Sequence, residues 1–486
     1  MVARALTHAL VGLEPRRVEV EAHLQGGLPG FAIVGLADRA CQEAKHRVRS
    51  GIASAALKWP ERRITVNLAP AALRKEGTGF DLSIALAVLA ASRQLPAERL
   101  WEHAVVGELA LDGRIRPVAG TIAFAEGARR HGVRRVLCAA ESAAEAGLAG
   151  VEAVPVAHLA QAVAYLRGDE RIEPAEPPEL GCEPDEAPDL ADVRGQERGR
   201  RALEIAAAGR HNLLLAGPPG TGKTMLARRL PGILPPLTRD EVLEVTRIHS
   251  VAGVLPPGRP LVTAPPFRAP HHGASAAAVV GGGTVPRPGE ASLAHRGVLL
   301  LDELPEFSRA VLEALRQPLE DGFVAVSRVG GAALFPAAFR LVGTMNMCPC
   351  GGRGDPAAEC RCTAQRIAAY QEKVSRALLD RFDLVVAMPR PRASELAAPP
   401  GERSQAVRER VVAARERLDG AVLRRTASAS ELLDRAVERL PLSGRGRTRV
   451  ARVARTIAAL AGASAVAAEH VAEALSYRVP RGLSGA

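Results

Sequence analysis

The sequence predicts an α/β protein in which two successive α/β regions are followed by a helical region. Three observations lead to this prediction. Strand-type and helix-type apolar runs alternate in two long stretches of the chain, an acidic proline-rich segment separates those stretches, and the last part carries only helical patterns. The chain has 486 residues, a length that suits about two to four domains.

The first α/β region is expected to cover residues 1–168. Strand-type runs such as RITVNLA (63–69) alternate there with helix-type runs such as FDLSIALAVLAAS (80–92). The next segment, residues 169–189, contains five prolines, nine acidic residues and one arginine. Such a composition cannot bury enough apolar surface to fold alone, and we interpret the segment as an acidic, Pro-rich linker.

The second α/β region, residues 190–395, contains the strongest motif of the chain. An apolar strand expected at 212–216 runs into GPPGTGKT and then into a helical pattern, which is the P-loop pattern in its required context. Glycines let backbone N–H groups surround phosphates, and the following helix N-terminus favours negative charge. Lys223 is expected to reach the β- and γ-phosphates of ATP, and Thr224 to bind Mg²⁺. The predicted ATP-binding residues are Gly217, Pro218, Pro219, Gly220, Thr221, Gly222, Lys223 and Thr224.

Two further apolar strands of this region end in polar residues. The run RGVLLLDELPEF ends its strand in Asp302, expected to bind Mg²⁺, and in Glu303, expected to activate the attacking water. The run FRLVGTMN ends in Asn346, whose amide could hold that water beside the γ-phosphate. An asparagine at the end of a strand is on its own more often a turn residue.

Four of the seven cysteines lie directly after Asn346, as two Cys-x-Cys pairs. Four thiolates in a short segment match the tetrahedral ligand set of structural zinc, although the spacing is less diagnostic than paired Cys-x₂-Cys. Another metal, an iron–sulfur cluster or free thiols remain alternatives. A metal would hold the glycine-rich loop that follows Asn346. The predicted zinc ligands are Cys348, Cys350, Cys360 and Cys362.

The third region, residues 396–486, shows only helical patterns, and it carries much of the chain's positive charge. The whole chain has a net charge of +11, and residues 401–486 alone hold 16 arginines against 9 acidic residues. This excess suits a polyanion such as nucleic acid, although an arginine-rich composition explains it equally well. No apolar run is long enough to cross a membrane and no signal peptide is evident, so we expect a cytoplasmic protein without membrane contact.

The motifs GPPGTGKT, GVLLLDELPEF, APHHGASAAAVVGGG, GTMNMCPCG and LLDRFDL, in this order, resemble the magnesium-chelatase-like AAA+ ATPases of the YifB/ComM family. The resemblance covers nearly the whole chain. It implies an AAA+ P-loop module with a C-terminal helical lid, assembled as a ring that is expected to be a hexamer. It also implies that Asn346 is the first sensor, Arg381 an arginine finger reaching the neighbouring subunit's ATP, and Arg445 the second sensor on the lid.

Two insertions of the second region are expected to line the pore of such a ring. One is the Gly- and Pro-rich segment 249–290, and the other is 323–338, which predicts a β-hairpin around two glycines. Packing between neighbouring subunits is the alternative role for both. The candidates for DNA contact on these segments are Arg268, His271, His272 and Arg328.

The first region is similar to the peptidase domain of the Lon family, which has a ribosomal-protein-S5-like fold. That family uses a serine–lysine pair, in which lysine activates the serine hydroxyl. In this chain the serine position falls on Gly79 and the lysine position near Ile122. Neither residue can do this chemistry, so we expect the domain to be non-catalytic.

Taken together, these features predict an ATP-hydrolysing ring motor that acts on DNA. The resemblance implies a helicase or branch-migration motor in homologous recombination and in natural transformation. Two other classes of function remain open: a chelatase-type motor subunit that inserts metal into a tetrapyrrole, and a protein-remodelling AAA+ chaperone. The chelatase motor would be expected to lack the Lon-like domain, and the chaperone to carry an aromatic pore residue.

Overall fold

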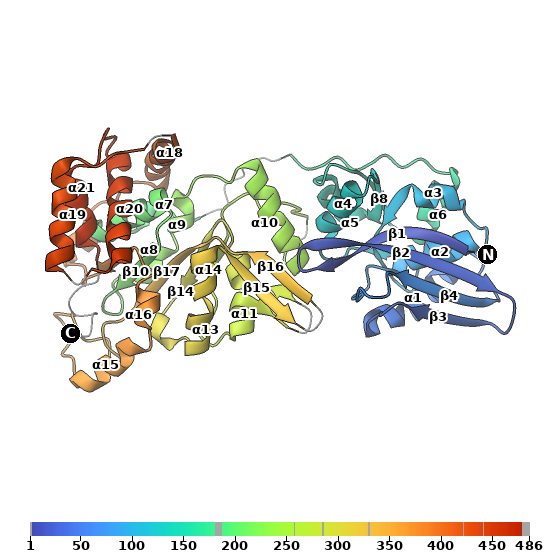
Figure 1. Cartoon of the computed structure of the whole chain (residues 1–486), viewed down its shortest axis with the longest axis horizontal. Helices are drawn as coiled ribbons and strands as arrows, with labels where there is room; N and C mark the ends of the chain where they lie inside the picture. The colour runs from blue at the N-terminus through green and yellow to red at the C-terminus, as the bar shows by residue number, and fades with distance from the viewer. Residues whose placement is uncertain are drawn as a thin grey trace.

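The computed structural model shows an elongated molecule in which an N-terminal α/β domain and a group of C-terminal helices lie at opposite ends of a central α/β core (Figure 1). The two sheets predicted from the alternating runs are both present. The structure describes residues 2–179, 187–256, 258–283, 286–328, 331–420, 422–440 and 442–478.

The N-terminal domain is built on a seven-stranded mixed sheet with the order β3-β4-β2-β1-β5-β8-β9. β1 and β2 form a long antiparallel hairpin, whereas β5, β8 and β9 are parallel. The strands are β1 (Val2–Val11), β2 (Glu14–Gln25), β3 (Gly30–Val34), β4 (Arg63–Ala69), β5 (His103–Val105), β8 (Arg135–Ala139) and β9 (Glu152–Val156), with the short β6 (Glu108–Leu109) and β7 (Ile115–Arg116) paired beside them.

Helices cover this sheet, and the central one is α2 (Asp81–Ala91). All its residues are buried, as expected for a helix that is apolar on every side. At the start of this helix, the carboxylate of Asp81 forms an ion pair with Arg47 at 2.6 Å. The other helices are α1 (Arg39–Ser54), α3 (Ala97–Trp101), α4 (Thr121–Arg130), α5 (Ala140–Gly147) and α6 (Leu159–Arg167).

The central core contains a five-stranded sheet with the order β11-β14-β17-β10-β18, and all its strand pairs are parallel. The residues of the three inner strands are all buried, and β10 and β14 are continuous apolar runs, the pattern expected when helices cover both faces. The prediction of an α/β fold is therefore confirmed. The strands are β10 (Leu213–Ala216), β11 (Phe267–Arg268), β14 (Val298–Leu301), β17 (Arg340–Met345) and β18 (Leu384–Ala387).

The remaining elements of the core lie around this sheet (Figure 1). The predicted hairpin is present as the antiparallel pair β15 (Phe323–Arg328) and β16 (Gly331–Pro336). The helices are α7 (Glu197–Gly209), α8 (Lys223–Ala227), α9 (Leu230–Ile233), α10 (Arg239–Ala252), α11 (Ala276–Val280), α12 (Glu290–Leu293), α13 (Arg309–Ala314), α14 (Arg316–Asp321), α15 (Ala364–Glu372), α16 (Arg376–Leu379) and α17 (Ala393–Ala397), and two further short strands, β12 (Gly281–Gly282) and β13 (Arg287–Pro288), pair with each other.

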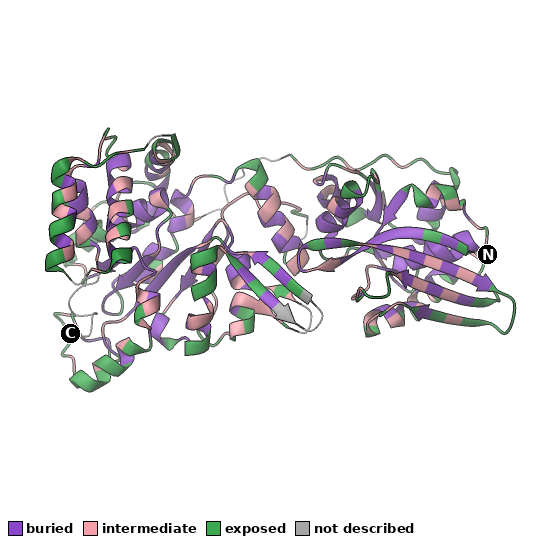
Figure 2. Cartoon of the chain, in the orientation of Figure 1, coloured by how far each residue is buried: buried purple, intermediate pink, exposed green. Residues whose placement is uncertain are grey.

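The C-terminal helices are α18 (Ser404–Gly420), α19 (Ala427–Arg439), α20 (Gly444–Leu460) and α21 (Ala468–Ser476). Their buried faces form one apolar cluster with α7 and with the core sheet, so they are packed on the core rather than attached by a tether. Figure 2 shows this pattern, with buried residues along the inner faces of these helices and exposed residues along their outer faces.

Among the described residues, the N-terminal domain contacts the core at the end of α10 and at the β1–β2 turn. At the first, Ser250 near the end of α10 donates to the buried carboxylate of Glu145 at 2.5 Å, and the Gly120 N–H donates to the Ser250 carbonyl at 3.0 Å. At the second, Leu13 in the β1–β2 turn belongs to the same apolar cluster as Phe335 of β16. The turn is so close that a Cβ on Gly12 would lie 2.7 Å from Ala333.

Residues 169–179 of the predicted linker lie along the N-terminal domain, whereas Asp189 at its end contacts Ser404 and Arg229 of the other parts. The Ala175 N–H donates to the Ala153 carbonyl of β9 at 2.8 Å, and Ile172 packs on the apolar core of the domain. Residues 180–186 fall outside the described residues. The first half of the segment is therefore docked on a folded surface, although its composition would not let it fold alone.

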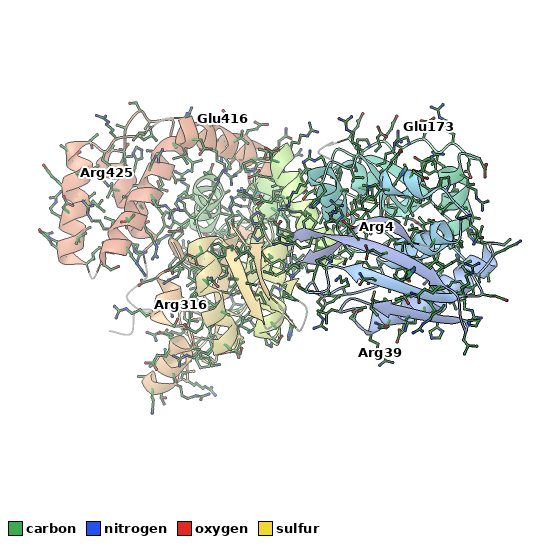
Figure 3. The ribbon with its side chains drawn as sticks, turned by 45° about the vertical axis from the view of Figure 1, so that its right-hand side comes forward. Arg4, Arg39, Glu173, Arg316, Glu416 and Arg425 are labelled. Carbon is green, nitrogen blue, oxygen red and sulfur yellow. The ribbon has the colours of Figure 1, made fainter. Side chains whose placement is uncertain are left out.

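Charged side chains cover the outer faces of all three parts. In Figure 3, Arg4 and Glu173 lie on the N-terminal domain, Arg316 on the core, and Glu416 and Arg425 on the C-terminal helices. Among the described residues, every helix is either too short or too polar to span a bilayer.

The contact between Glu145 and Ser250 predicts a pH-dependent stability. Burial raises the pKa of Glu145, against the opposing effect of its hydrogen bonds from Ser250 and Ile122. A raised pKa favours the protonated carboxyl in the folded state, so its contribution to stability is present at low pH and is lost as the pH rises through the raised value. Glu145→Gln keeps the acceptor oxygen without the ionisation. Its free energy of unfolding, relative to the unchanged chain, should therefore increase from pH 5 to pH 8.

Urea unfolding at the two pH values measures this difference. Glu141→Gln, an exposed position on the same helix, serves as the control. Ser250→Ala removes the donor to Glu145 and should cost about 1–3 kcal/mol. An equal pH dependence in Glu145→Gln and in the unchanged chain would contradict this account.

Candidate functional site

The P-loop connects the end of β10 to the start of α8, as its strand–loop–helix context predicts. The first glycine is required by close packing, because a Cβ on Gly217 would lie 2.2 Å from the Met388 carbonyl oxygen. The Lys223 ammonium folds back over the loop and donates to the carbonyls of Gly217 at 2.8 Å and Pro218 at 2.7 Å. Burial lowers the pKa of Lys223, while Asp302 and Glu303 act in the opposite direction. The ammonium is thus held at the loop beside two acidic residues.

The two acidic residues after β14 have different surroundings. Asp302 accepts hydrogen bonds from Thr224 at 2.8 Å and from Thr344 at 2.6 Å through the same carboxylate oxygen. Glu303 is exposed, and its backbone adopts a left-handed conformation with φ of 56°. Residues other than glycine rarely adopt this conformation, and those that do are found preferentially at functional sites. Asp302 and Thr224 are therefore adjacent, as a shared Mg²⁺ would require, while Glu303 faces solvent.

Thr344 is a site residue that the sequence reasoning missed. Its hydroxyl donates to Asp302 and accepts from the Glu303 N–H at 3.0 Å, so it joins both acidic residues to β17. The signal was available in the sequence. Successive side chains of a strand alternate between its two faces, so a threonine two residues before Asn346 lies on the same face as Asn346.

The strand order brings Asn346 to the P-loop. β17 lies between β10 and β14, with Ala216 in register with Met345. The Asn346 side chain therefore comes directly beside the P-loop, and Lys223 donates to its Oδ1 at 3.2 Å. The structure thus brings together four of the predicted residues, Lys223, Thr224, Asp302 and Asn346, at the carboxyl ends of three neighbouring strands, with Glu303 next in sequence.

The four predicted cysteine ligands also come together. Their sulfur atoms all lie within 4.8 Å of one another, and three of the sulfur–sulfur distances are 3.4, 3.6 and 3.8 Å. Four thiolates around zinc at about 2.3 Å would be about 3.8 Å apart, so the donor set fits a tetrahedral metal ion. A hydrogen bond from the Gly352 N–H, with smaller effects of the other thiols, lowers the pKa of Cys350 to about 6. The cluster could therefore hold a metal ion.

The cysteine loop packs directly on the P-loop. A Cβ on Gly351 would lie 2.7 Å from the Pro219 side chain, and φ of Gly351 is 76°, so glycine is required here on both counts. The Gln371 side chain donates to the Met347 carbonyl at 3.1 Å and ties the start of the loop to α15. The cysteine loop therefore supports the phosphate-binding loop by direct packing.

The two arginines predicted to act on ATP lie elsewhere. The Arg381 carbonyl accepts from the Asn212 side chain, just before β10 begins, so Arg381 sits at the opposite edge of the sheet from its own P-loop. Its guanidinium is buried and contacts Glu320 of α14. Arg445, at the start of α20, lies 3.8 Å from the same carboxylate and is exposed. Glu320 therefore groups both arginines at one edge, away from the P-loop of their own chain.

Glu320 was not anticipated from the sequence, since nothing distinguishes it from other acidic residues on helices.

The structure shows the surroundings of three of the four candidates for DNA contact. Arg268 makes a two-point ion pair with Glu290 at 2.6 and 2.8 Å, so its charge is already partnered. His271 and His272 are exposed, with ring centroids 4.0 Å apart. The Arg328 side chain lies outside the described residues.

The two positions that align with the Lon serine and lysine have apolar surroundings. A Cβ on Gly79 would meet the side chains of Val118, Val106 and Phe124, and Ile122 is fully buried at the start of α4. The expectation of a non-catalytic domain rests on the identity of these two residues. The Lon-like assignment of the fold stays a prediction.

Comparisons with known proteins cover the whole chain. Three family profiles match in succession: "Subunit ChlI of Mg-chelatase" at residues 20–142, "Magnesium chelatase, subunit ChlI" at 189–396, and "Magnesium chelatase, subunit ChlI C-terminal" at 401–478. The YifB protein of Escherichia coli is 43% identical over 97% of this chain and 96% of its own length. The competence protein ComM of Haemophilus influenzae is 43% identical over 98% and 97%. The chain belongs to the YifB/ComM family of magnesium-chelatase-like proteins.

The resemblance noted in the sequence is thereby confirmed. A magnesium-chelatase 67 kDa subunit from Heliobacterium mobile is also similar, but it is 29% identical and covers only 34% of this chain. In this chain the P-loop, the two acidic residues after β14 and the strand order of the core sheet agree with an AAA+ module. Membership of this family suggests that the module uses ATP and Mg²⁺.

Proposed function

We propose that this protein is an ATPase that works as a ring and moves DNA strands, as a helicase or branch-migration motor in homologous recombination and natural transformation. The observation that carries the ATPase part is the grouping of Lys223, Thr224, Asp302 and Asn346 at one edge of the sheet. The DNA part is supported by the similarity, over 98% of this chain, to a protein named for competence. It is also supported by the positive charge of residues 401–486.

Each residue of the site has a role in this proposal. The Lys223 ammonium would exchange the carbonyls of Gly217 and Pro218 for β- and γ-phosphate oxygens. Thr224 and Asp302 would hold Mg²⁺, which supplies positive charge beside the transferred phosphoryl group. Glu303, exposed beside them, would take a proton from the attacking water, and Asn346 would orient that water.

The arginine finger is proposed to act between subunits. This proposal is supported by the position of Arg381, which lies at the edge of the sheet opposite its own P-loop and is therefore not next to its own nucleotide site. Arg445 lies with it, next to Glu320. On assembly the Arg381 guanidinium would have to leave Glu320 for the γ-phosphate. Hydrolysis would then depend on the ring, since an arginine on the transferred phosphate is worth about 10³ or more in rate.

Two other functions are separated by experiment. The first is a chelatase motor subunit. The family profile that matches the N-terminal domain is itself named for the chelatase subunit, so the presence of this domain does not distinguish a chelatase motor from a DNA motor. A protein remodeller is the second. Its candidate aromatic pore residue, Phe267, lies in β11 of the core sheet and is half-buried against the apolar core.

ATPase rates with and without DNA test the proposal. We expect single-stranded or branched DNA to stimulate hydrolysis, with a stimulation that falls as salt rises because phosphate contacts release counterions. Glu303→Gln should still bind ATP while its hydrolysis falls by about 10² or more. Glu306→Gln, on the same turn, is the control. Stimulation by unfolded polypeptide or by a porphyrin-loaded partner, with none by DNA, would favour one of the other two functions.

Mixing two inactive variants tests whether the finger acts in trans. Arg381→Ala subunits keep the P-loop lysine and Lys223→Ala subunits keep the finger, so mixed rings contain junctions with both. If subunits mix at random in equal amounts, about a quarter of the junctions are intact and a similar share of the wild-type rate should return. Lys223→Ala mixed with Glu303→Gln is the matched control, because both changes fall on the nucleotide side of the junction. No recovery in the first mixture would refute a finger in trans.

The cysteine cluster is proposed to hold a structural zinc ion. Metal analysis of the purified protein should find about one zinc per chain, and Cys348→Ser with Cys360→Ser should lose it. The control is Cys138→Ala, a buried thiol in the N-terminal domain. Because Gly351 packs on Pro219, zinc removal should also speed hydrogen exchange at the P-loop amides. A protein with no metal and four freely titrating thiols would overturn the assignment.

A further inference from the structure

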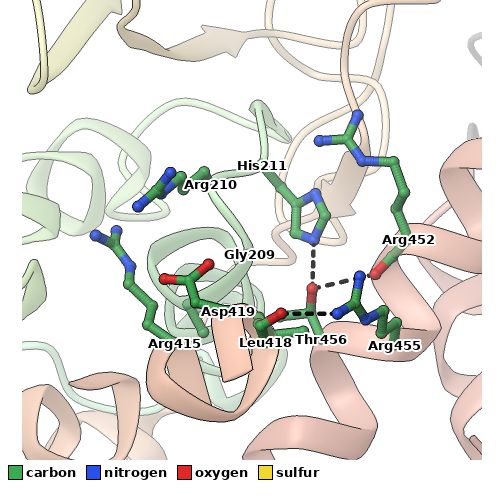
Figure 4. A pocket seen from close by; sticks show the side chains of 10 residues that line it. Gly209, Arg210, His211, Arg415, Leu418, Asp419, Arg452, Arg455 and Thr456 are labelled. Carbon is green, nitrogen blue, oxygen red and sulfur yellow. Dashed lines mark hydrogen bonds between the residues drawn. The ribbon is translucent and has the colours of Figure 1, made fainter. Parts of the chain in front are cut away.

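A cavity of about 170 Å³ lies where the C-terminal helices meet the core, away from the P-loop. It is partly open to solvent and is lined by the end of α7 and by α18 and α20 (Figure 4). Four arginines and one aspartate are among its lining residues, so the lining has a net charge of +3 when histidine is counted as neutral. These residues are Arg210, Arg415, Arg452, Arg455 and Asp419.

The arginines at the cavity outnumber the carboxylates near it, which are Asp419 in the lining and Asp383 and Glu241 close by. Among the described residues, no carboxylate lies within ion-pairing distance of Arg210, Arg415 or Arg452, and the nearby Arg340 has no ion pair either. Burial and the charge of Arg210 lower the pKa of Arg415 to about 10, although Asp419 partly opposes them. Burial, followed by the charges of Arg415 and Arg210, lowers the pKa of Arg340 to about 9. An anion here would relieve this repulsion.

The cavity walls are held in place before any ligand binds. Arg415 donates twice to the Ala207 carbonyl, at 3.1 and 2.7 Å, and Arg455 donates to the Leu418 carbonyl at 2.7 Å. At the floor, His211 and Thr456 are 2.9 Å apart. Figure 4 shows these side chains around a common space, with Arg210 and Arg452 on opposite sides of His211. A site ordered in this way loses little conformational freedom when it binds a ligand.

The backbone at Gly209 is part of this construction. A Cβ at this position would lie 2.1 Å from His211 Nε2 and 2.4 Å from Thr456 Oγ1. Any side chain would displace the floor of the cavity.

We propose that this cavity is a second anion site, in which guanidinium groups of its lining bind a phosphate group. Guanidinium groups match the oxygens of phosphate in a planar, two-point geometry, and several of them around one space suit a compact tetrahedral anion with more than one negative charge. The phosphate could belong to a small molecule such as pyrophosphate or to a nucleic-acid backbone, and the experiment separates these two sources.

This site is distinct from the ATP site. Gly209, Arg210 and His211 precede β10, whereas the P-loop follows it, and the four residues of the strand put about 13 Å between its two ends. A bound phosphate would bridge α7 of the core to α18 and α20. The ligand would therefore fasten the C-terminal helices to the strand that carries the P-loop.

The test uses the full-length chain with Lys223→Ala, which weakens phosphate binding at the P-loop. Pyrophosphate binding is measured by calorimetry in this background and then with Arg210→Gln and Arg452→Gln added. Both arginines are exposed, so the fold should tolerate the changes. The affinity should fall at least about tenfold. Arg435→Gln, an exposed arginine on α19, is the control for net charge and should leave the affinity unchanged.

Two further measurements complete the test. Arg452→Lys keeps the charge but loses the planar fork, and it should weaken binding more than Arg435→Gln does. A single-stranded oligonucleotide replaces pyrophosphate in a parallel series. Loss of pyrophosphate affinity in the double variant indicates a small phosphate ligand, and loss of oligonucleotide affinity alone indicates a backbone phosphate. If neither probe distinguishes the double variant from Arg435→Gln, or if neither binds, the proposal is wrong.

Discussion

The position of β17 between β10 and β14 is the constraint on which the nucleotide site depends. All three strands are parallel, so their carboxyl ends meet at one edge, and the residues that follow them are neighbours although they are up to 123 positions apart in the sequence. Lys223 then contacts Asn346, and Thr224 contacts Asp302, without any long or irregular connection. A different order of the same strands would keep every motif and still lose the site.

Much of this site was predictable because most of its residues directly follow a buried strand. The P-loop, Asp302, Glu303 and Asn346 all follow buried strands, and a buried parallel strand leaves a clear pattern in the sequence. The α/β class and the family were predictable for the same reason. The domain boundaries, which rest on composition and residue patterns, and the Lon-like assignment, which rests on resemblance, remain predictions.

What could not be predicted depends on contacts between distant segments. Glu320 carries no local signal, yet it contacts Arg381 and lies near Arg445. Arg268 was expected to face DNA, but its pairing with Glu290 depends on how β11 and α12 pack. The arginines around His211 come from α7, α18 and α20, and the sequence shows only that the C-terminal region is basic. Such groupings follow from tertiary packing, which residue patterns along one segment do not encode.

The contact of the β1–β2 turn with β16 has a consequence for the independence of the ATPase core. Leu13 is 3% exposed and Phe335 is fully buried, and both belong to one apolar cluster that is shared between the N-terminal domain and the core. Separating the two parts would bring this apolar surface into water. The N-terminal domain therefore covers part of the apolar interior of the core and shields it from water.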